Sequence, residues 1–155
     1  MALFGCQSFQ DKKMIKIIEA KTKKELSKCL EIRTKVFVEE QSVPIDKEID
    51  DLDKVGIHSL VLINHTAIAT GRLIPLNDKN GKIGRMAVLT EYRKIGIGGL
   101  IINFLEAKAL EKNIKVITLD AQEYVKKFYS NHGYAEQGEV FLEVGIPHIK
   151  MKKKL

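Results

Sequence analysis

The sequence predicts a single α/β domain built on a mixed, mostly antiparallel sheet of six to seven strands, with helices on both faces. Two observations support this prediction. Residues 83–105 contain an apolar strand, a glycine-rich loop and a helix with apolar residues at helical spacing. Around this unit, strand and helix patterns alternate along 155 residues, a length that suits one domain with one sizeable core.

The predicted elements follow one another as β-α-(loop)-β-β-β-α-β-α-β-β. Apolar runs and weak alternation give the strands, and apolar residues at helical spacing give the helices. The strands are expected at residues 14–19, 58–63, 66–76, 86–89, 114–119, 134–139 and 144–151. The helices are expected at residues 23–39, 97–113 and 122–130.

Local signals justify the elements of the first half. Thr22 followed by Glu25 is a capping-box pattern, which predicts the start of the first helix. Pro44 ends any helical tendency, and residues 42–56 are expected to form an acidic loop. Residues 1–13 are expected to be a flexible segment ahead of a domain at 14–155.

Turn residues separate the later elements. Asn64-His65 is a candidate hairpin turn, and residues 77–81, which end in Asn80-Gly81, predict the next turn. Asn113 suits the left-handed conformation that often ends a helix. The strand at 114–119 should run parallel to the earlier one across a right-handed crossover. The lysine-rich residues 150–154 are expected to be a solvated tail.

Composition excludes several classes of protein. No apolar run approaches the ~20 residues of a membrane span, and residues 1–13 lack the pattern of a signal peptide. Cys6 and Cys29 are too few for a disulfide framework, which favours a reducing, cytoplasmic setting. The four histidines are scattered without metal-ligand spacing, so no metal site is predicted.

Charge is distributed unevenly. Residues 39–53 hold seven acids and one base, a net charge of −6, which leaves +12 for the rest of a chain whose total is +6. A basic body suits an anionic cofactor or nucleic acid, and an acidic segment suits a cationic substrate. A nucleic-acid partner is not expected, because the chain has no helix-turn-helix, zinc spacing or basic platform rich in aromatic residues.

The glycine loop is a candidate phosphate site. First-turn N–H groups of a helix lack internal partners and carry the positive end of its dipole, glycines let an anion approach, and Arg93 and Lys94 add charge. A pyrophosphate fits these features. The loop has neither the Walker pattern nor the Rossmann pattern, since Gly96 and Gly98 have no glycine at position 101.

Four local matches give the chain a resemblance to a known family. The R-x-x-G-x-G pattern of residues 93–98, directly after an apolar strand, resembles the coenzyme A signature of the GNAT superfamily of acetyl-CoA-dependent N-acetyltransferases. Residues 128–134 resemble the family's F-Y-x-x-x-G-[FY] segment. Two blocks look like the ElaA-like branch: residues 33–41, followed by Glu48, Asp50, Asp53 and His58, and residues 145–151.

The resemblance implies a binding mode for acetyl-CoA. The pantetheine arm would lie along the strand like an added strand, the Val88 amide would face the thioester oxygen, and the pyrophosphate would sit on the loop amides. The cofactor-binding residues implied in this way are Met86, Ala87, Val88, Arg93, Lys94, Ile95, Gly96, Ile97, Gly98, Gly99 and Gln122.

The sequence supports the candidate general acid better than the candidate general base. Tyr129 is the candidate general acid, because a phenol stays protonated at neutral pH and can donate to a thiolate. Some family members carry a glutamate before the glycine loop, where this chain has Gly84 or Arg85. Glu40 is the substitute general base, with Glu39 and Asp120 as rivals. The residues expected at the acceptor site are Arg33, Phe37, Gln41, Asp50 and His148, and the loops at 41–56 and 138–145 are expected to shape its pocket.

Two functions remain open from the sequence. The first is an N-acetyltransferase, a monomer or homodimer, that acts on a small cationic amine or a protein amino group by direct attack. The second is a non-catalytic acetyl-CoA sensor, which the missing glutamate keeps open and Tyr129 argues against.

Overall fold

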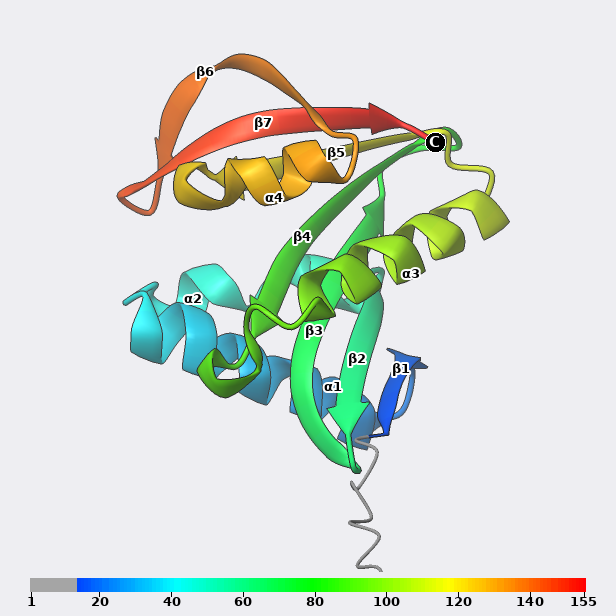
Figure 1. The fold of residues 1–155 in the computed structure, drawn as a ribbon, viewed down its shortest axis with the longest axis vertical. Helices are drawn as coiled ribbons and strands as arrows, with labels where there is room; N and C mark the ends of the chain where they lie inside the picture. Colours follow the sequence, from blue (N-terminus) through cyan, green and yellow to red (C-terminus); the bar gives the residue numbers. More distant parts are fainter. Residues whose placement is uncertain (1–13) are drawn as a thin grey trace, which may run out of the picture.

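The computed structural model describes residues 14–155, so the predicted flexible segment 1–13 lies outside the described residues. One seven-stranded sheet, with strand order β1-β2-β3-β4-β5-β7-β6, forms the centre (Figure 1). The strands are β1 (Ile15–Ala20), β2 (Ile57–Ile63), β3 (Thr66–Pro75), β4 (Asn80–Val88), β5 (Val116–Gln122), β6 (Ala135–Glu143) and β7 (Ile146–Lys154). The α-helices are α1 (Lys23–Arg33), α2 (Ile45–Glu48), α3 (Ile97–Glu111) and α4 (Lys126–Asn131).

The sheet is antiparallel except between β4 and β5, as predicted. This parallel pairing is short. It begins at Asn80 opposite Val116 and ends at Lys82 opposite Thr118, after which the two strands diverge (Figure 1). Arg85 has φ 50°, and the register of β3 with β4 shifts between Thr70 and Arg72, so a bulge bends β4 where the divergence begins.

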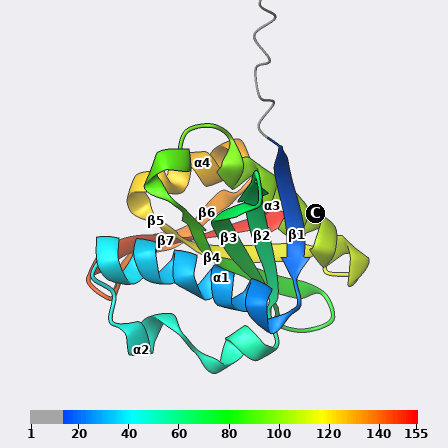
Figure 2. The same ribbon diagram turned by 90° about the horizontal axis from the view of Figure 1, so that it is seen from below.

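Helices cover both faces of the sheet (Figure 2). α1 packs on one face over a small cluster that includes Cys29, Ile32 and Leu60. α3 packs on the other face over the larger cluster, where Ile101 and Leu105 are fully buried. α4 joins α3 on this face, and its aromatic residues contact the same cluster. The core is therefore divided by the sheet into two apolar layers.

The first helix starts as predicted but changes its winding. The Thr22 hydroxyl accepts from Glu25 N–H at 3.1 Å, and the Glu25 carboxylate accepts from Thr22 N–H at 2.9 Å. After α1, residues Thr34–Glu40 form a π-helix, η1, which closes with Gln41 N–H donating to Val36 at 3.2 Å. Such wide turns are uncommon and are often found at functional sites.

One of the two predicted turns agrees with the structure, and the other differs from it. Asn64 and His65 have φ 47° and 70°, the left-handed pair that a two-residue hairpin requires. Asn80-Gly81, by contrast, does not form a turn: both residues belong to β4, which is longer than the predicted strand at 86–89. The Asn77 side chain makes the turn instead, by accepting from the N–H groups of Lys79 and Asn80 at 2.9 Å each.

The predicted basic tail was wrong. Residues 150–154 continue β7, which lies between β5 and β6 inside the sheet. Met151 is fully buried, and Lys153 Nζ contacts both carboxylate oxygens of Glu106 at 2.8 Å. The alternation of Ile149 and Met151 with lysines is the sequence signal for a strand with one buried face.

The predicted acidic loop is folded onto three arginines. Residues 42–56 contain α2 and a 3₁₀ turn at Asp51–Lys54. Arg33, from α1, donates to Glu48 Oε1 and Asp53 Oδ1 at 2.7 Å each. Arg72, from β3, donates to Asp50 Oδ1 and Asp53 Oδ1 at 2.7 Å each. This arrangement ties the segment to one helix and one strand.

The bulge in β4 belongs to the same network. Arg85 Nε lies 3.3 Å from Glu48 Oε1, and its guanidinium also reaches Asp50 Oδ2 at 3.3 Å. Three carboxylates thus neutralise three arginines. Burial alone would raise the pKa of Asp53, but the hydrogen bonds from Arg33 and Arg72 lower it below its ordinary value. The acidic segment therefore serves mainly to hold the structure together. Glu48, Asp50 and Asp53 are not available to attract a cationic substrate, a role that the sequence led us to expect.

The depressed pKa of Asp53 predicts a pH-dependent stability. A carboxylate whose pKa is lowered by folding stabilises the protein above its unfolded pKa of about 3.9, and this contribution disappears as pH falls through the folded pKa. Asp53→Asn should lower the free energy of unfolding by about 3 kcal/mol at pH 7. The difference from wild type should shrink below about pH 4.

Urea unfolding between pH 3 and pH 7 measures this difference. Asp51→Asn is the matched control, because Asp51 is fully exposed and its nearest cation, Lys54, lies at 3.9 Å. The control should change stability by less than about 0.5 kcal/mol at every pH. Equal losses in the two variants would contradict the structural role of the network.

Candidate active site

The last residues of β4 present a free backbone edge to the gap beside β5. Leu89 N–H donates to Ile68 at 3.0 Å, so the backbone of Leu89 faces β3. Because successive residues of a strand face opposite edges, the N–H and C=O of Val88 face away from β3. Arg93 Nε reaches the Val88 carbonyl from that side at 2.8 Å. The Val88 N–H therefore faces the gap left by the divergence of β5.

The glycine loop ends in an uncapped helix N-terminus. Lys94 and Gly96 have φ 64° and 89°, and these left-handed residues fold the chain into the start of α3 at Ile97. Gly96 is the N-cap and contributes no side-chain cap, so the first-turn N–H groups of α3 are available to an anion. Within residues 14–155, a Cβ added to Gly96 would meet no atom within 4 Å.

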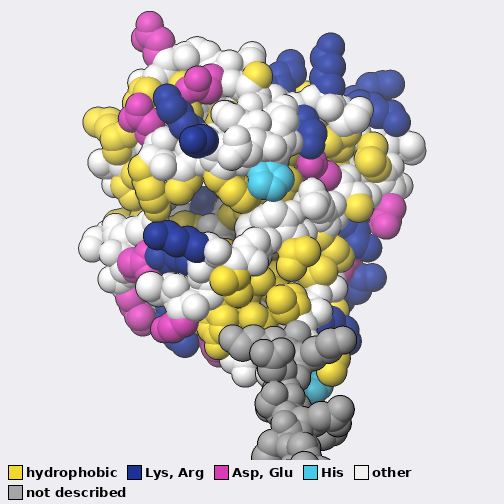
Figure 3. All heavy atoms as spheres, in the orientation of Figure 1, with side chains coloured by type: hydrophobic (Ala, Val, Ile, Leu, Met, Phe, Trp, Pro, Cys, Tyr) yellow, Lys and Arg dark blue, Asp and Glu magenta, His cyan; other side chains and the backbone are white. Residues whose placement is uncertain are grey.

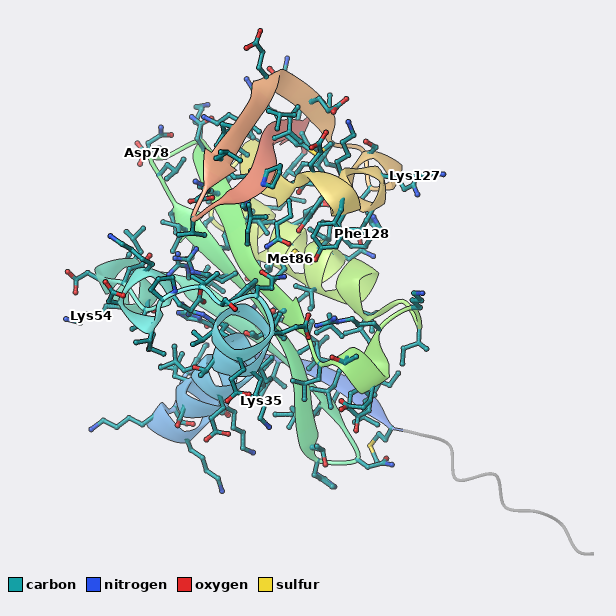
Figure 4. The ribbon with its side chains drawn as sticks, turned by 90° about the vertical axis from the view of Figure 1, so that its left-hand side faces the viewer. Lys35, Lys54, Asp78, Met86, Lys127 and Phe128 are labelled. Atoms are coloured by element: carbon teal, nitrogen blue, oxygen red, sulfur yellow. The ribbon has the colours of Figure 1, made fainter. Side chains whose placement is uncertain are left out.

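Gly98 and Gly99 have a second role that the sequence did not reveal. A Cβ added to Gly98 would lie 2.9 Å from Phe128 Cζ, and one added to Gly99 would lie 3.1 Å from His132 Nε2. The two glycines therefore allow α3 and α4 to approach closely. In Figure 4, Phe128 lies near the centre of the molecule with Met86, whereas Lys127 points away from α4.

Glu40 is held by the loop rather than free to act as a base. Its carboxylate accepts from both terminal nitrogens of Arg93 at 2.9 Å and from the Thr90 hydroxyl at 3.1 Å. The hydrogen bond from Arg93 lowers the pKa of Glu40 below its ordinary value. A carboxylate with a lowered pKa and both oxygens engaged is a weak general base, so this geometry argues against the role expected for Glu40.

Tyr129 points its hydroxyl at β4. The hydroxyl lies 3.6 Å from Met86 Sδ, and the ring packs edge-on against Phe128 and Tyr134. Burial raises the pKa of Tyr129 to about 12, with a smaller contribution from Tyr124. The phenol is therefore fully protonated at neutral pH. It stands beside the same open stretch of β4 that carries Val88.

Two glutamines bridge the gap. Gln122 Nε2, at the end of β5, donates to Gln41 Oε1 at 2.8 Å, and Gln41 Nε2 reaches back to Gln122 Oε1 at 3.3 Å. Gln41 follows the π-helix, so this contact joins η1 to β5 across the diverging strands. The space-filling view shows the surface hollowed between α4 and the η1–α2 region (Figure 3).

The other residues expected at the acceptor site are dispersed. Arg33 is 1% exposed and bound to carboxylates, and Asp50 holds Arg72 and Arg85, so neither side chain is free for a substrate. Phe37 packs against the apolar layer under α1. His148 is buried on β7, with Nδ1 at 2.7 Å from the Ile146 carbonyl. The expected set therefore does not form one site.

A cavity lies on the sheet beyond β5 and includes part of the segment 138–145. It has a volume of about 420 Å³ and is lined by Asp120, Gln137, Glu139, Phe141 and Lys150. Its residues come from three strands, β5, β6 and β7. Asp120 is a rival base candidate from the sequence, and Glu139 and Phe141 belong to the segment 138–145 that is expected to shape the acceptor pocket. Neither Gln137 nor Lys150 is predicted as a site residue, and both are brought to the cavity by strand pairing.

Between residues 14 and 155, no group of three or more His, Cys, Asp or Glu side chains has a geometry that could hold a metal ion. In the same part of the chain, no helix is long and apolar enough to cross a membrane.

Comparisons with known proteins identify the family. A family model described as an acetyltransferase (GNAT) domain matches residues 18–155. The chain is 36% identical over 140 residues to an uncharacterized N-acetyltransferase, YjcF, of Bacillus subtilis, covering 90% of this chain and 99% of YjcF. It is 33% identical over 135 residues to the protein ElaA of Escherichia coli, covering 84% of this chain and 88% of ElaA.

Solved structures agree in fold. The crystal structure of Escherichia coli ElaA superposes with a TM-score of 0.81 at 28% identity, covering 91% of this chain and 100% of that one. An acyl-CoA N-acyltransferase from Pseudomonas aeruginosa gives a TM-score of 0.79 at 30% identity, covering 91% and 99% of the two chains. The predicted GNAT fold and the ElaA-like resemblance are confirmed.

The close approach of α3 and α4 predicts a packing effect at Gly98. Gly98→Ala should lower the free energy of unfolding by about 1–3 kcal/mol, because the new methyl group overpacks against the Phe128 ring. The double variant with Gly98→Ala and Phe128→Leu should lose less free energy of unfolding than the sum of the losses in the two single variants. A double-mutant cycle by chemical denaturation measures this coupling. Strict additivity would show that the ring does not limit residue 98.

Proposed function

This chain belongs to the ElaA-like branch of the GNAT acetyltransferases, and from that membership we propose that it is an N-acetyltransferase. It transfers the acetyl group of acetyl-CoA to a primary amine by direct attack. The observation that carries the proposal is the convergence of three groups on the gap beside β5. They are the outward-facing N–H of Val88, the N-terminus of α3 and the hydroxyl of Tyr129.

The glycine loop and the open edge of β4 would hold acetyl-CoA. Free N–H groups at the start of α3 suit the pyrophosphate, and Lys94 adds an exposed positive charge. The amide-rich pantetheine arm suits the unpaired edge of β4, because an extended chain can hydrogen-bond there as an additional strand. Arg93 supports this site indirectly, by fixing the loop to Glu40 and to the Val88 carbonyl.

Val88 and Tyr129 have different roles in the proposed reaction. The Val88 N–H donates to the carbonyl oxygen as negative charge develops on it, while the acceptor nitrogen forms the new N–C bond. As the C–S bond breaks, the Tyr129 hydroxyl donates to the leaving sulfur. Burial raises the pKa of the Tyr129 phenol, and exclusion of water raises the pKa of a thiol in the same direction. The pKa values of the proton donor, Tyr129, and of the proton acceptor, the leaving sulfur, therefore rise together.

Asp120 replaces Glu40 as the candidate base. Its Oδ2 contacts Lys82 Nζ at 2.7 Å, and within residues 14–155 its buried Oδ1 has no hydrogen-bond partner. The Asp120 carboxylate would take the proton of an incoming ammonium group, which must be neutral to attack, and would release this proton to solvent after the reaction. The proton that the nitrogen loses after attack restores Tyr129, so the products are the amide and the free thiol of coenzyme A.

The cofactor site is tested by a pair of substitutions at Gly96. Aspartate and asparagine tolerate a left-handed φ comparably and are nearly equal in size, so they differ chiefly in charge. Gly96→Asp should weaken acetyl-CoA binding at least tenfold by repelling the pyrophosphate, and Gly96→Asn should weaken it much less. Isothermal titration and the thermal shift caused by acetyl-CoA measure this difference. Equal affinities would remove the loop from the site.

The chemical role of Tyr129 is tested by removing its hydroxyl. Tyr129→Phe should lower kcat about 10²-fold while leaving acetyl-CoA affinity nearly unchanged, measured as thiol release with a panel of amines. Tyr134→Phe is the matched control, because Tyr134 is a neighbouring buried tyrosine whose hydroxyl has no partner among residues 14–155. The control should retain wild-type turnover.

Two results would count against the proposal. Wild-type turnover in Tyr129→Phe would exclude the hydroxyl from the reaction. Stabilisation by acetyl-CoA without thiol release for any amine would instead favour the non-catalytic binder.

A further inference from the structure

The cavity beside Asp120 exists because β6 leaves β7. The two strands pair from Ala135 to Gln137 and again from Phe141 to Glu143, and the register shifts between these stretches. Gly138, with φ 75°, turns the intervening residues away, and Figure 1 shows β6 arching over β7. The space beneath this arch is the cavity of about 420 Å³, a size that suits a small molecule.

The cavity lies on the face of the sheet opposite the layer that contains Tyr129. Ile117, Leu119 and Ala121 of β5 face the apolar layer under α3 and α4, where Tyr129 also packs. The alternate residue Asp120 therefore faces the opposite side, together with Gln122, which contacts Gln41. A ligand in the cavity and the hydroxyl of Tyr129 thus approach the gap from opposite faces.

Asp120 lies on the part of β5 that no longer pairs with β4. The pairing of β4 with β5 ends at Lys82 and Thr118, so Asp120 and Gln122 belong to the part of β5 that borders the gap. The open stretch of β4 on the other side of this gap carries Met86, which the Tyr129 hydroxyl contacts. An amine bound at Asp120 has a short path to the gap.

Charges of both signs line the cavity. Lys150 is directly opposite Asp120 on the neighbouring strand, so the two side chains share a face. In the described chain, neither Lys150 nor Glu139 makes an ion pair within 4.0 Å, and Asp120 keeps Oδ1 free. With Lys82 bound to Asp120, the four side chains sum to zero. The cavity therefore offers separate positive and negative partners rather than a uniformly acidic surface.

We propose that this cavity binds a zwitterionic acceptor, a small amino acid whose amine faces Asp120 and whose carboxylate faces Lys150. The order of the strands supports this direction. β5 borders the gap and β7 lies behind it, so Asp120 is nearer the reacting groups than Lys150. Phe141, stacked on His148 at 5.9 Å, supplies an apolar wall for a side chain. This inference rests on the proposed N-acetyltransferase function and replaces the expected cationic acceptor.

The test compares amines that differ by a carboxylate. Leucine and isoamylamine share the same side chain and primary amine, and the ratio of their kcat/KM values reports recognition of the carboxylate. Wild type should favour leucine. Lys150→Met should lower the ratio at least tenfold, and Lys150→Glu should invert it. Asp120→Asn should lower kcat/KM for both amines and leave their ratio unchanged.

Lys127→Met is the matched control, because it removes one exposed lysine on α4 that points away from the molecule (Figure 4). It should keep the wild-type ratio. Thermal melts of each variant check that the fold is intact. Phenylalanine with phenethylamine gives a second pair, which shows whether the preference follows the carboxylate rather than one side chain.

A binding measurement separates this inference from the proposed function. Saturation-transfer NMR with leucine, in the presence of coenzyme A, detects occupancy without turnover. Binding that Lys150→Met abolishes and Lys127→Met retains would support the cavity even if no amine were acetylated. Turnover that shows no preference for leucine, or a preference independent of Lys150, would overturn the cavity and leave the acetyltransferase intact. Neither turnover nor binding for either pair would overturn both.

Discussion

The early end of the pairing between β4 and β5 is the constraint on which the candidate site depends. Every other neighbouring pair of strands shares at least six register partners, whereas these two share three and end at Lys82. A continuous ladder would satisfy the backbone of β4 and leave nothing for a ligand. The divergence leaves the Val88 N–H facing a gap, so the fold gives up hydrogen bonds in order to keep a binding edge.

The ion pairs that bind Arg33, Arg72 and Arg85 support this divergence of β4 from β5. Arg85 is a non-glycine residue at positive φ, a conformation that the surrounding structure must stabilise. Its guanidinium is bound to Glu48 and Asp50, which are themselves held by Arg33 and Arg72. Removing one partner from such a buried set leaves an uncompensated charge. The acids of residues 42–56 therefore fix the bend of β4, and through it the position of the open edge.

Local patterns predicted what depends on neighbouring residues. The sequence predicted the capping box at Thr22, the turn at Asn64 and the glycine loop, because each is a short-range signal with its own geometry. Pairings between distant residues were not. The use of Arg33 and Asp50 inside one network, and the capture of Glu40 by Arg93, depend on contacts between segments that the sequence does not place together. For the same reason the sequence did not indicate that Gln137 and Lys150 join Asp120 at the cavity under β6.

The two layers of the core are consistent with a sheet that binds the two reactants of the proposed reaction from opposite faces. Tyr129 and the glycine loop belong to the face covered by α3 and α4, and Asp120 and Gln122 face the other side. A sheet closed along β4 and β5 would separate these groups completely. Because it opens between them, the proposed reaction would let a donor bound on one side and an amine bound on the other meet without passing through either apolar layer. Direct transfer as proposed would draw much of its rate from this proximity, which fits a site where Glu40 holds the loop instead of acting as a base.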